Sequence, residues 1–216
     1  MELRTEEEQI AAIKDWWKRN GSSLLIGIGA ALAIVFGWQA WENHQEEQQS
    51  AAGAKFQQLI TAVSQPDGEE KEKTITFVTK ELQDEFDSSA YAVYGSLILA
   101  AHQFSQQDDA KAAVETLKWA KSHAAKGPLV TLITQRQAQA EFAAGDADAA
   151  LSTLRSVDEP GEYAALYAEL EGDILRSQGD IEGAREAYTV ARDAAGDARN
   201  PILELKMADM AIGEDA

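Results

Sequence analysis

Residues 145–150 read GDADAA, and the pattern returns as GDIEGA at residues 179–184, 34 residues further along the chain. A period of 34 residues is that of the tetratricopeptide repeat, in which each unit is a hairpin of two helices. The glycine ends the first helix, because glycine adopts a left-handed backbone without a side-chain penalty. The aspartate caps the second helix by accepting from free backbone N–H groups. The residues in these roles are Gly145 and Gly179, and Asp146 and Asp180.

Further small and apolar residues follow the same period around these turns. We expect Ala150 and Ala184 to be small because the two helices of a hairpin approach each other most closely there. The remaining repeat positions are Ala138, Leu154 and Val157 in the earlier unit, and Gly172, Tyr188 and Ala191 in the later one. Alanine-rich helices imitate such positions, so a generic helical bundle is the alternative interpretation.

A less regular unit precedes the earlier of these two by 37 residues rather than 34. Its repeat positions are Leu97, Ala101, Asp108, Ala113, Leu117 and Ala120, with Asp108 in place of the turn glycine. The additional residues are expected in the loop around residues 127–128. At the other end, a helix from Pro201 with Leu203, Leu205 and Met207 would cover the open end of the stack, because solenoids need capping units.

Tetratricopeptide arrays bind an extended segment or a helix of a partner in a concave groove, which we expect the first helix of each unit to line. Candidate groove residues are Tyr94, Leu97, Gln135, Gln139, Tyr163 and Tyr167. Tyrosines in such helices are more often packing residues than ligand contacts, so these assignments predict a face rather than a defined site.

Residues 42–90 predict a helical stalk followed by the first helices of the domain. A polar helix continues from Glu42, and residues 65–68 (QPDG) read as a turn. Apolar residues at helical spacing are Phe56, Leu59, Ile60 and Val63 before this turn, and Ile75, Val78, Leu82 and Phe86 after it. With Pro and Gly scarce, the pattern predicts an all-α protein with tetratricopeptide-like repeats and a capping helix over residues 91–216.

Upstream of the stalk, residues 20–41 (NGSSLLIGIGAALAIVFGWQAW) carry no charge. About 20 mostly apolar residues suffice for a helix to cross the hydrocarbon core of a membrane. Lys14, Lys18 and Arg19 precede the stretch, and acidic residues follow it. Because Lys and Arg favour the cytoplasmic side, we expect a single transmembrane helix in contact with membrane lipid, a cytoplasmic arm at residues 1–19 and an exported C-terminal domain.

Tryptophans flank this stretch as membrane-interface residues do. Trp16 and Trp17 lie at one end, and Trp38 and Trp41 lie at the other. A cleaved secretory signal is the alternative, since residues 31–33 (ALA) have the small-x-small form of a cleavage site. The long, acid-containing segment before the stretch and the apolar residues after this site favour an uncleaved anchor. A buried core helix is less favoured, because few core helices are apolar all round over about five turns.

Gly29, Ala33 and Gly37 recur every four residues and form a stripe of small residues within the span. Such a stripe lets a second helix approach closely enough for van der Waals packing, the main attraction between helices in lipid. Membrane helices are rich in Gly and Ala in any case, so the stripe suggests a helix partner without identifying one.

The composition argues against several classes of function. The net charge is −18, of which residues 1–41 contribute −1, so the exported part would repel nucleic acid and anionic lipid headgroups. The chain has no cysteine and therefore no disulfide or zinc–thiolate site. Its histidines, His44, His102 and His123, lack metal-ligand spacing, and no catalytic motif is present. We expect neither an enzyme nor a bound metal or other cofactor.

The chain resembles the YfgM-like ancillary subunit of the bacterial Sec translocon. The resemblance rests on residues 16–21 (WWKRNG), on the glycine-bearing span that ends in Gly37, Trp38 and Trp41, and on residues 56–65 (FQQLITAVSQ). The degenerate repeat array behind them is similar as well, so the likeness extends over essentially the whole chain. The missing turn glycine of the first repeat departs from the pattern and leaves the boundaries of that unit open.

The resemblance implies a single-pass protein of the bacterial inner membrane, with its N-terminus in the cytoplasm and its repeat domain in the periplasm. It also implies association with Sec translocon subunits and with a membrane-anchored periplasmic chaperone of the peptidyl-prolyl isomerase superfamily, to which newly translocated proteins are passed. No catalytic residues carry over. Two other functions fit the same sequence: an adaptor of envelope or cell-division machinery, and a cleaved periplasmic accessory of an enzyme.

Overall fold

The computed structural model describes residues 6–105, 109–196 and 200–210, and within these ranges the regular structure is helical, without a strand. The chain divides into two compact units, Met1–Ala51 and Ala52–Ala216. Each unit is described by itself. The all-α fold class predicted from the spacing of apolar residues is confirmed.

The first unit consists of the N-terminal part of one long helix, α1 (Glu6–Val63). Residues 20–41 lie inside this helix, and neither Asn20 nor Gly21 interrupts it. The Asn20 side chain donates to the carbonyl of Trp16 over 3.0 Å, so the amide group is hydrogen-bonded within the helix. Among the described residues, α1 is the one helix that is long and apolar enough to cross a membrane.

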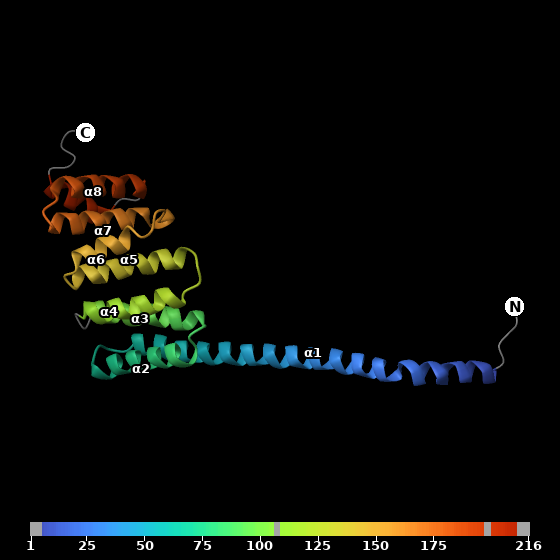
Figure 1. The fold of residues 1–216 in the computed structure, drawn as a ribbon. Helices are drawn as coiled ribbons and strands as arrows, with labels where there is room; N and C mark the ends of the chain where they lie inside the picture. The colour runs from blue at the N-terminus through green and yellow to red at the C-terminus, as the bar shows by residue number, and fades with distance from the viewer. Residues whose placement is uncertain (1–5, 106–108, 197–199, 211–216) are drawn as a thin grey trace. The chain divides into compact units, whose positions relative to one another are not determined.

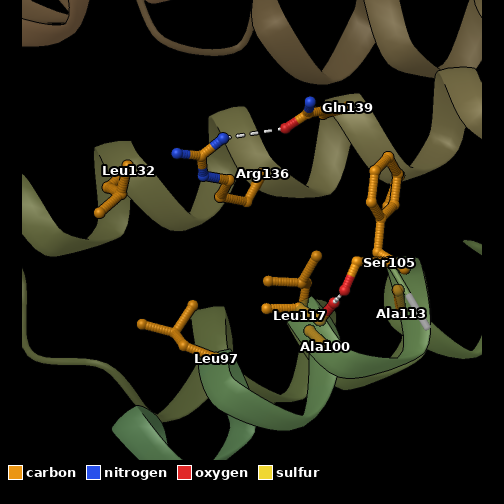
Figure 2. A pocket seen from close by; sticks show the side chains of 11 residues that line it. Leu97, Ala100, Ser105, Ala113, Leu117, Leu132, Arg136 and Gln139 are labelled. Carbon is orange, nitrogen blue, oxygen red and sulfur yellow. Dashed lines mark hydrogen bonds between the residues drawn. The ribbon is translucent and has the colours of Figure 1, made fainter.

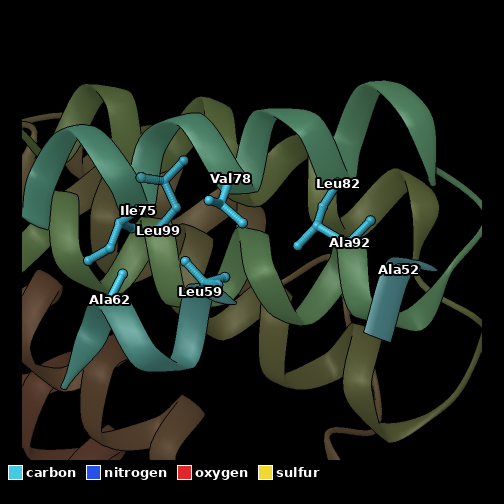
Figure 3. Close-up of a cluster of buried hydrophobic side chains, with 8 residues drawn as sticks. All are labelled: Ala52, Leu59, Ala62, Ile75, Val78, Leu82, Ala92 and Leu99. Carbon is cyan, nitrogen blue, oxygen red and sulfur yellow. The ribbon is translucent and has the colours of Figure 1, made fainter. Parts of the chain in front are cut away.

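The second unit begins with the last turns of α1, which pack with α2 (Glu69–Glu85) and α3 (Ala90–Ser105) around a shared apolar core. Figure 3 shows the buried side chains of this core, Ala52, Leu59, Ala62, Ile75, Val78, Leu82, Ala92 and Leu99. The expected turn separates α1 from α2. The predicted face of α1 is partly wrong, because Ile60 and Val63 are more than a third exposed, while the small residues Ala52 and Ala62 are buried.

Three helical hairpins follow and lie in succession along the unit (Figure 1). The helices are α3 with α4 (Ala110–His123), α5 (Pro128–Ala143) with α6 (Ala147–Leu154), and α7 (Ala164–Ser177) with α8 (Ile181–Ala195); a short 3-10 helix, η1 (Gly161–Tyr163), precedes α7. Buried apolar clusters join each hairpin to its neighbours, so the core is continuous along the stack, as a solenoid requires.

The turns of the second and third hairpins have the geometry that their sequence pattern demands. Gly145 has φ 87° and Gly179 has φ 83°, a left-handed backbone that favours glycine. The side chains of Asp146 and Asp180 each accept a 3.0 Å hydrogen bond from the backbone N–H three residues later. Glycine and aspartate therefore end one helix and begin the next within two residues.

The first hairpin differs in the spacing of its buried small residues. Its second helix is capped by Asp109, whose side chain accepts from the backbone three residues later over 3.0 Å; Asp108 lies outside the described residues. The buried residues Ala100 and Ala113 are 13 positions apart, one more than Ala138 and Ala150 of the next hairpin. The repeat register of the first helix therefore shifts by one residue. The small buried position is Ala100, and the expectation of Ala101 there was wrong, since Ala101 is exposed.

The third hairpin is closed by direct contact between a glycine and an aromatic ring. Gly172 of α7 faces Tyr188 of α8 so closely that an added Cβ would lie 2.6 Å from the ring. Tyr188, Ala184 and Ala191 have no exposed surface. Gly172 therefore makes room for the Tyr188 ring, while Ala184 and Ala191 complete the packed side of α8, and Ala150 is equally buried on α6.

The last helix, α9 (Pro201–Asp209), covers the end of the stack. Leu203 and Met207 are buried in one cluster with Tyr188 of α8. The prediction that Leu205 shares this face was wrong, because Leu205 is 68% exposed. Leu203 and Met207 are four residues apart and lie on one side of the helix, whereas Leu205 projects from the other side.

Candidate protein-binding pocket

Helix α3 carries a row of four residues at helical spacing along the edge of its packed side. They are Tyr94, Leu97, Ala101 and Phe104. Tyr94 is 44% exposed and Phe104 is 37% exposed, whereas Leu97 is half-buried. A solvated helix face would ordinarily be polar, so this apolar row marks α3 as a surface available for contact.

The row opens onto a pocket of about 470 Å³ between α3, α4 and α5 (Figure 2). The residues that line it are Leu97, Ala100, Ala101, Phe104, Ser105, Ala113, Leu117, Leu132, Arg136, Gln139 and Ala140. Figure 2 shows Leu132, Arg136 and Gln139 on α5, across the pocket from Leu97 and Leu117 on the other two helices. Alanines on the walls leave space that larger side chains would fill, so the pocket can accept a bulky apolar group.

Arg136 brings a positive charge to this apolar pocket. Its Nη1 donates to Oε1 of Gln139 over 3.0 Å, which holds the guanidinium against α5. Among the residues that the structure describes, no carboxylate lies within 4.0 Å of that guanidinium. Since Gln139 uses a single donor of the five that an arginine offers, the remaining donors are available to a ligand.

The predicted groove residues separate into two groups. Leu97 and Gln139 line the pocket, and Tyr94 lies one turn from Leu97 on the same row. Gln135 and Tyr167 are instead buried, so their assignment to an accessible groove was wrong. The remaining candidate, Tyr163, is partly buried against the core of the second and third hairpins.

Tyr167 is a packing residue that joins two hairpins. Its hydroxyl donates to the carbonyl of Thr131 on α5 over 2.7 Å, and its ring lies in the core that α5, α6 and α7 share. Burial raises the pKa of the Tyr167 hydroxyl to about 12. The hydroxyl therefore stays protonated, and keeps its hydrogen bond to α5, to a higher pH than an exposed tyrosine would.

Helix α7 has a row equivalent to that of α3, but α9 lies against it. Lys206 of α9 donates to Glu169 over 2.8 Å and to Asp173 over 2.7 Å. The Tyr188 hydroxyl also donates to Asp173, over 2.8 Å, and Asn200 donates to Glu169 over 2.9 Å. Burial lowers the pKa of Lys206, but the hydrogen bonds and charges of Asp173 and Glu169 outweigh it, so the net pKa is raised. Ion pairs between Lys206 and the two carboxylates therefore hold α9 against α7.

Six residues of the pocket were not identified from the sequence: Ala100, Phe104, Ser105, Leu132, Arg136 and Ala140. The row on α3 contained a usable signal for Phe104, because it lies seven residues after Leu97 on the same helix face. Leu132 and Arg136 are one turn apart on α5 and lie on the side that faces α3. Which side of α5 faces α3 depends on how the hairpins pack, and the local sequence pattern does not predict this.

The predicted membrane residues lie along α1 in the first unit. Trp16, Trp17, Trp38 and Trp41 are each more than half exposed, and the rings of Trp38 and Trp41 are 5.3 Å apart. Gly29 and Gly37 have open space where a Cβ would stand, and nothing within the described residues covers Ala33. An interfacial role for the tryptophans and a helix-packing role for the small residues remain predictions.

Known proteins resemble this chain over nearly its whole length. A family model of the tetratricopeptide repeat-like domain matches residues 14–212. Several relatives carry the name ancillary SecYEG translocon subunit. The one from Haemophilus influenzae is 30% identical, over 94% of this chain and 96% of the relative. Those from Escherichia coli (29%, over 96% and 97%) and Neisseria gonorrhoeae (25%, over 94% and 95%) are similar along their lengths too.

The match covers the long helix α1 as well as the stacked hairpins, because it begins at residue 14 and ends at residue 212. The helical pairs, the turn glycines and the caps described above give the same architecture independently of any relative. The chain therefore belongs to the tetratricopeptide repeat-like family that includes the ancillary SecYEG translocon subunits.

Proposed function

We propose that this protein is a membrane-anchored accessory of the Sec translocon whose repeat domain binds segments of other proteins. The observation that carries the proposal is the near full-length similarity to proteins named ancillary SecYEG translocon subunit, together with an apolar pocket on the repeat domain. A helical repeat stack without a cofactor motif suits binding rather than chemistry. The protein would act by holding partners close to the channel.

The anchor is the part of α1 that contains residues 20–41. Its apolar length supports a single crossing, and the cluster of Lys14, Lys18 and Arg19 before it supports a cytoplasmic N-terminus. In this topology the tryptophans at both ends of the span lie at the membrane interfaces. The membrane is the bacterial inner membrane, and the repeat domain lies in the periplasm.

The repeat domain would receive newly translocated proteins as they leave the channel and pass them to periplasmic chaperones. One such chaperone would be a membrane-anchored member of the peptidyl-prolyl isomerase superfamily. Because the domain is tethered near the channel exit, its effective concentration toward an emerging chain is high. Weak and short-lived contacts in the pocket are then sufficient, and they favour release to the next partner.

The test is site-specific photocrosslinking within the membrane, read by mass spectrometry. A photoreactive residue is placed at Gly29, Ala33 or Gly37, and a control is placed at Val35, which lies about 200° from Ala33 around the helix. We expect translocon subunits to be crosslinked from the three small-residue positions and not from the control. Crosslinks confined to a second copy, or to envelope or cell-division assemblies, would reject the translocon assignment and favour the adaptor instead.

A further inference from the structure

The α3–α5 pocket combines apolar walls with the guanidinium of Arg136, which lacks an acidic partner among the described residues. This combination indicates the chemistry of the ligand that would fit it. In a chain of net charge −18, a positive side chain has many carboxylates available to it. The other described arginines of the second unit, Arg155, Arg176, Arg185 and Arg192, each pair with an aspartate or glutamate. Among these described arginines, Arg136 alone has none, although it borders the pocket.

We propose that the pocket recognises protein segments in which a bulky apolar side chain is followed closely by a carboxylate. The proposal rests on the proposed binding function and adds the chemistry of the segment that is bound. The apolar side chain would enter the space between Leu97, Leu117 and Leu132, and the carboxylate would pair with Arg136. Guanidinium and carboxylate form two parallel hydrogen bonds, which gives the pair directional preference as well as attraction.

The spacing of the two groups follows from α5. Leu132 and Arg136 are four residues apart on one helix, so about 6 Å of axial rise separates them. In an extended peptide each residue advances about 3.3 Å, so a carboxylate two residues away from the apolar residue spans the same distance. The motif is therefore an apolar residue, any residue and an acidic residue in an extended segment.

The electrostatic field of the surrounding domain makes the pocket more selective for where a peptide carries its carboxylate. The rest of the domain is strongly acidic and repels acidic peptides at long range, so a carboxylate is accepted only where a local positive charge neutralises it. Gln139 orients the guanidinium through its 3.0 Å hydrogen bond and carries no charge that would compete with the ligand. Acidic residues placed elsewhere in a peptide gain nothing from this arrangement.

The experiment measures the affinity of the full-length protein in lipid nanodiscs for two labelled peptides by fluorescence anisotropy. One nonapeptide contains Leu-Ser-Glu in a Ser and Gly background, and the other contains Leu-Ser-Gln. We expect the wild-type protein to bind the Glu peptide about 5-fold more tightly, the effect of a partly exposed ion pair. Arg136→Gln should remove this preference without weakening binding of the Gln peptide, and added salt should reduce the preference in the wild-type protein.

A matched control has the same change in net charge at a site outside the pocket. Arg155→Gln, at the residue that follows α6, breaks the surface pair with Glu171 and should leave the peptide preference intact. A charge reversal provides a test by gain of binding. The Arg136→Glu protein should bind a Leu-Ser-Lys peptide more tightly than Leu-Ser-Glu. Thermal unfolding of each variant by circular dichroism verifies that the repeat stack is intact.

A preference that survives Arg136→Gln, equal affinities for both peptides, or no binding of either peptide would each overturn the inference. None of these results bears on the crosslinks from the membrane span. A protein that contacts the translocon through its anchor but shows no carboxylate preference would retain the proposed function and lose this specificity. The reverse result would keep the specificity and reject the translocon assignment.

Discussion

Helices α3 and α7 are each the first helix of a hairpin, yet the equivalent face borders an open pocket on α3 and is covered by α9 on α7. The four residues on α3 are Tyr94, Leu97, Ala101 and Phe104, and those 72 positions later on α7 are Leu166, Glu169, Asp173 and Arg176. On α7 the charged residues bind α9, through Lys206 and Asp209. On α3, Leu97, Ala101 and Phe104 line a pocket that α5 only partly fills. Different side chains on one repeated face therefore close one junction and leave a pocket at the other.

The largest expected difference comes from removing an aromatic ring at each junction. Tyr188→Ala should lower the free energy of unfolding by about 3–5 kcal/mol, because a fully buried ring leaves a cavity beside Gly172. Phe104→Ala should cost about 1 kcal/mol or less, because Phe104 is already more than a third exposed. Urea denaturation of both variants measures the two values. Equal losses would contradict the distinction between a sealed and an open junction.

The next effect concerns the charges that hold α9. Lys206→Met should destabilise the repeat domain by about 2 kcal/mol, because it leaves Glu169 and Asp173 partly buried without their cation. Lys73→Met is the control, since Lys73 and its partner Glu69 are both largely exposed, and it should cost about 0.5 kcal/mol or less. Hydrogen exchange should report the loss first in α9. If both variants behave alike, the α7–α9 network does not close the stack.

Helix caps should contribute equally at the open and sealed ends. Asp109→Ala, Asp146→Ala and Asp180→Ala each remove one 3.0 Å hydrogen bond to a helix N-terminus and should each cost about 1 kcal/mol. The matching Asn variants should restore most of the loss, because an amide oxygen also caps a helix. Thermal unfolding of the six variants provides the measurement. A much larger effect at Asp180 would show that the third hairpin depends on more than local capping.

The last effect is expected at alkaline pH, where buried tyrosines ionise. Burial raises the pKa of Tyr167 from its ordinary 10.0 to about 12, and burial together with Asp173 raises the pKa of Tyr188. A group whose folded-state pKa is raised contributes fully below its unfolded pKa and loses that contribution as pH rises through the folded value. The raised pKa of Lys206 has the same sign.

We therefore expect the free energy of unfolding to fall between about pH 10 and pH 12. Tyr167→Phe should reduce the slope of this decrease, because its phenol no longer titrates, although it also loses the bond to Thr131. Phe104→Ala at the open pocket should leave the slope unchanged. Urea denaturation across this pH range measures the slopes for the wild type and the two variants. Identical slopes in all three would show that ionisation of Tyr167 does not contribute to the loss of stability.

The turns and the repeat period were predictable because their determinants are local. A glycine that must adopt positive φ and an aspartate that must cap the next helix are adjacent in sequence, so the pair at Gly179 and Asp180 could be recognised without a structure. The period then placed Ala184 and Tyr188 on the packed side of α8. Long-range structure added detail that this period did not contain, such as the contact of Tyr188 with Gly172.

The pocket was not predictable, because it depends on how three helices are placed together. Whether Ala100 or Ala101 is buried depends on one additional residue between the two helices of the first hairpin, relative to the other hairpins. The ion pairs of Lys206 join residues more than 30 positions apart, so sequence spacing gave no hint of them. The face of α9 was equally ambiguous, since a nine-residue helix offers too few turns to separate Leu203 from Leu205.

The most direct test of the account is photocrosslinking from the pocket during protein export in intact cells. The probe replaces Leu132, and the control probe replaces Val190, which is 56% exposed on α8 outside the pocket. We predict that newly exported chains are crosslinked from position 132 and not from position 190, and that these products disappear when translocation is blocked. Equal crosslinking from both positions, or products at position 132 that persist without translocation, would contradict a binding site for emerging proteins.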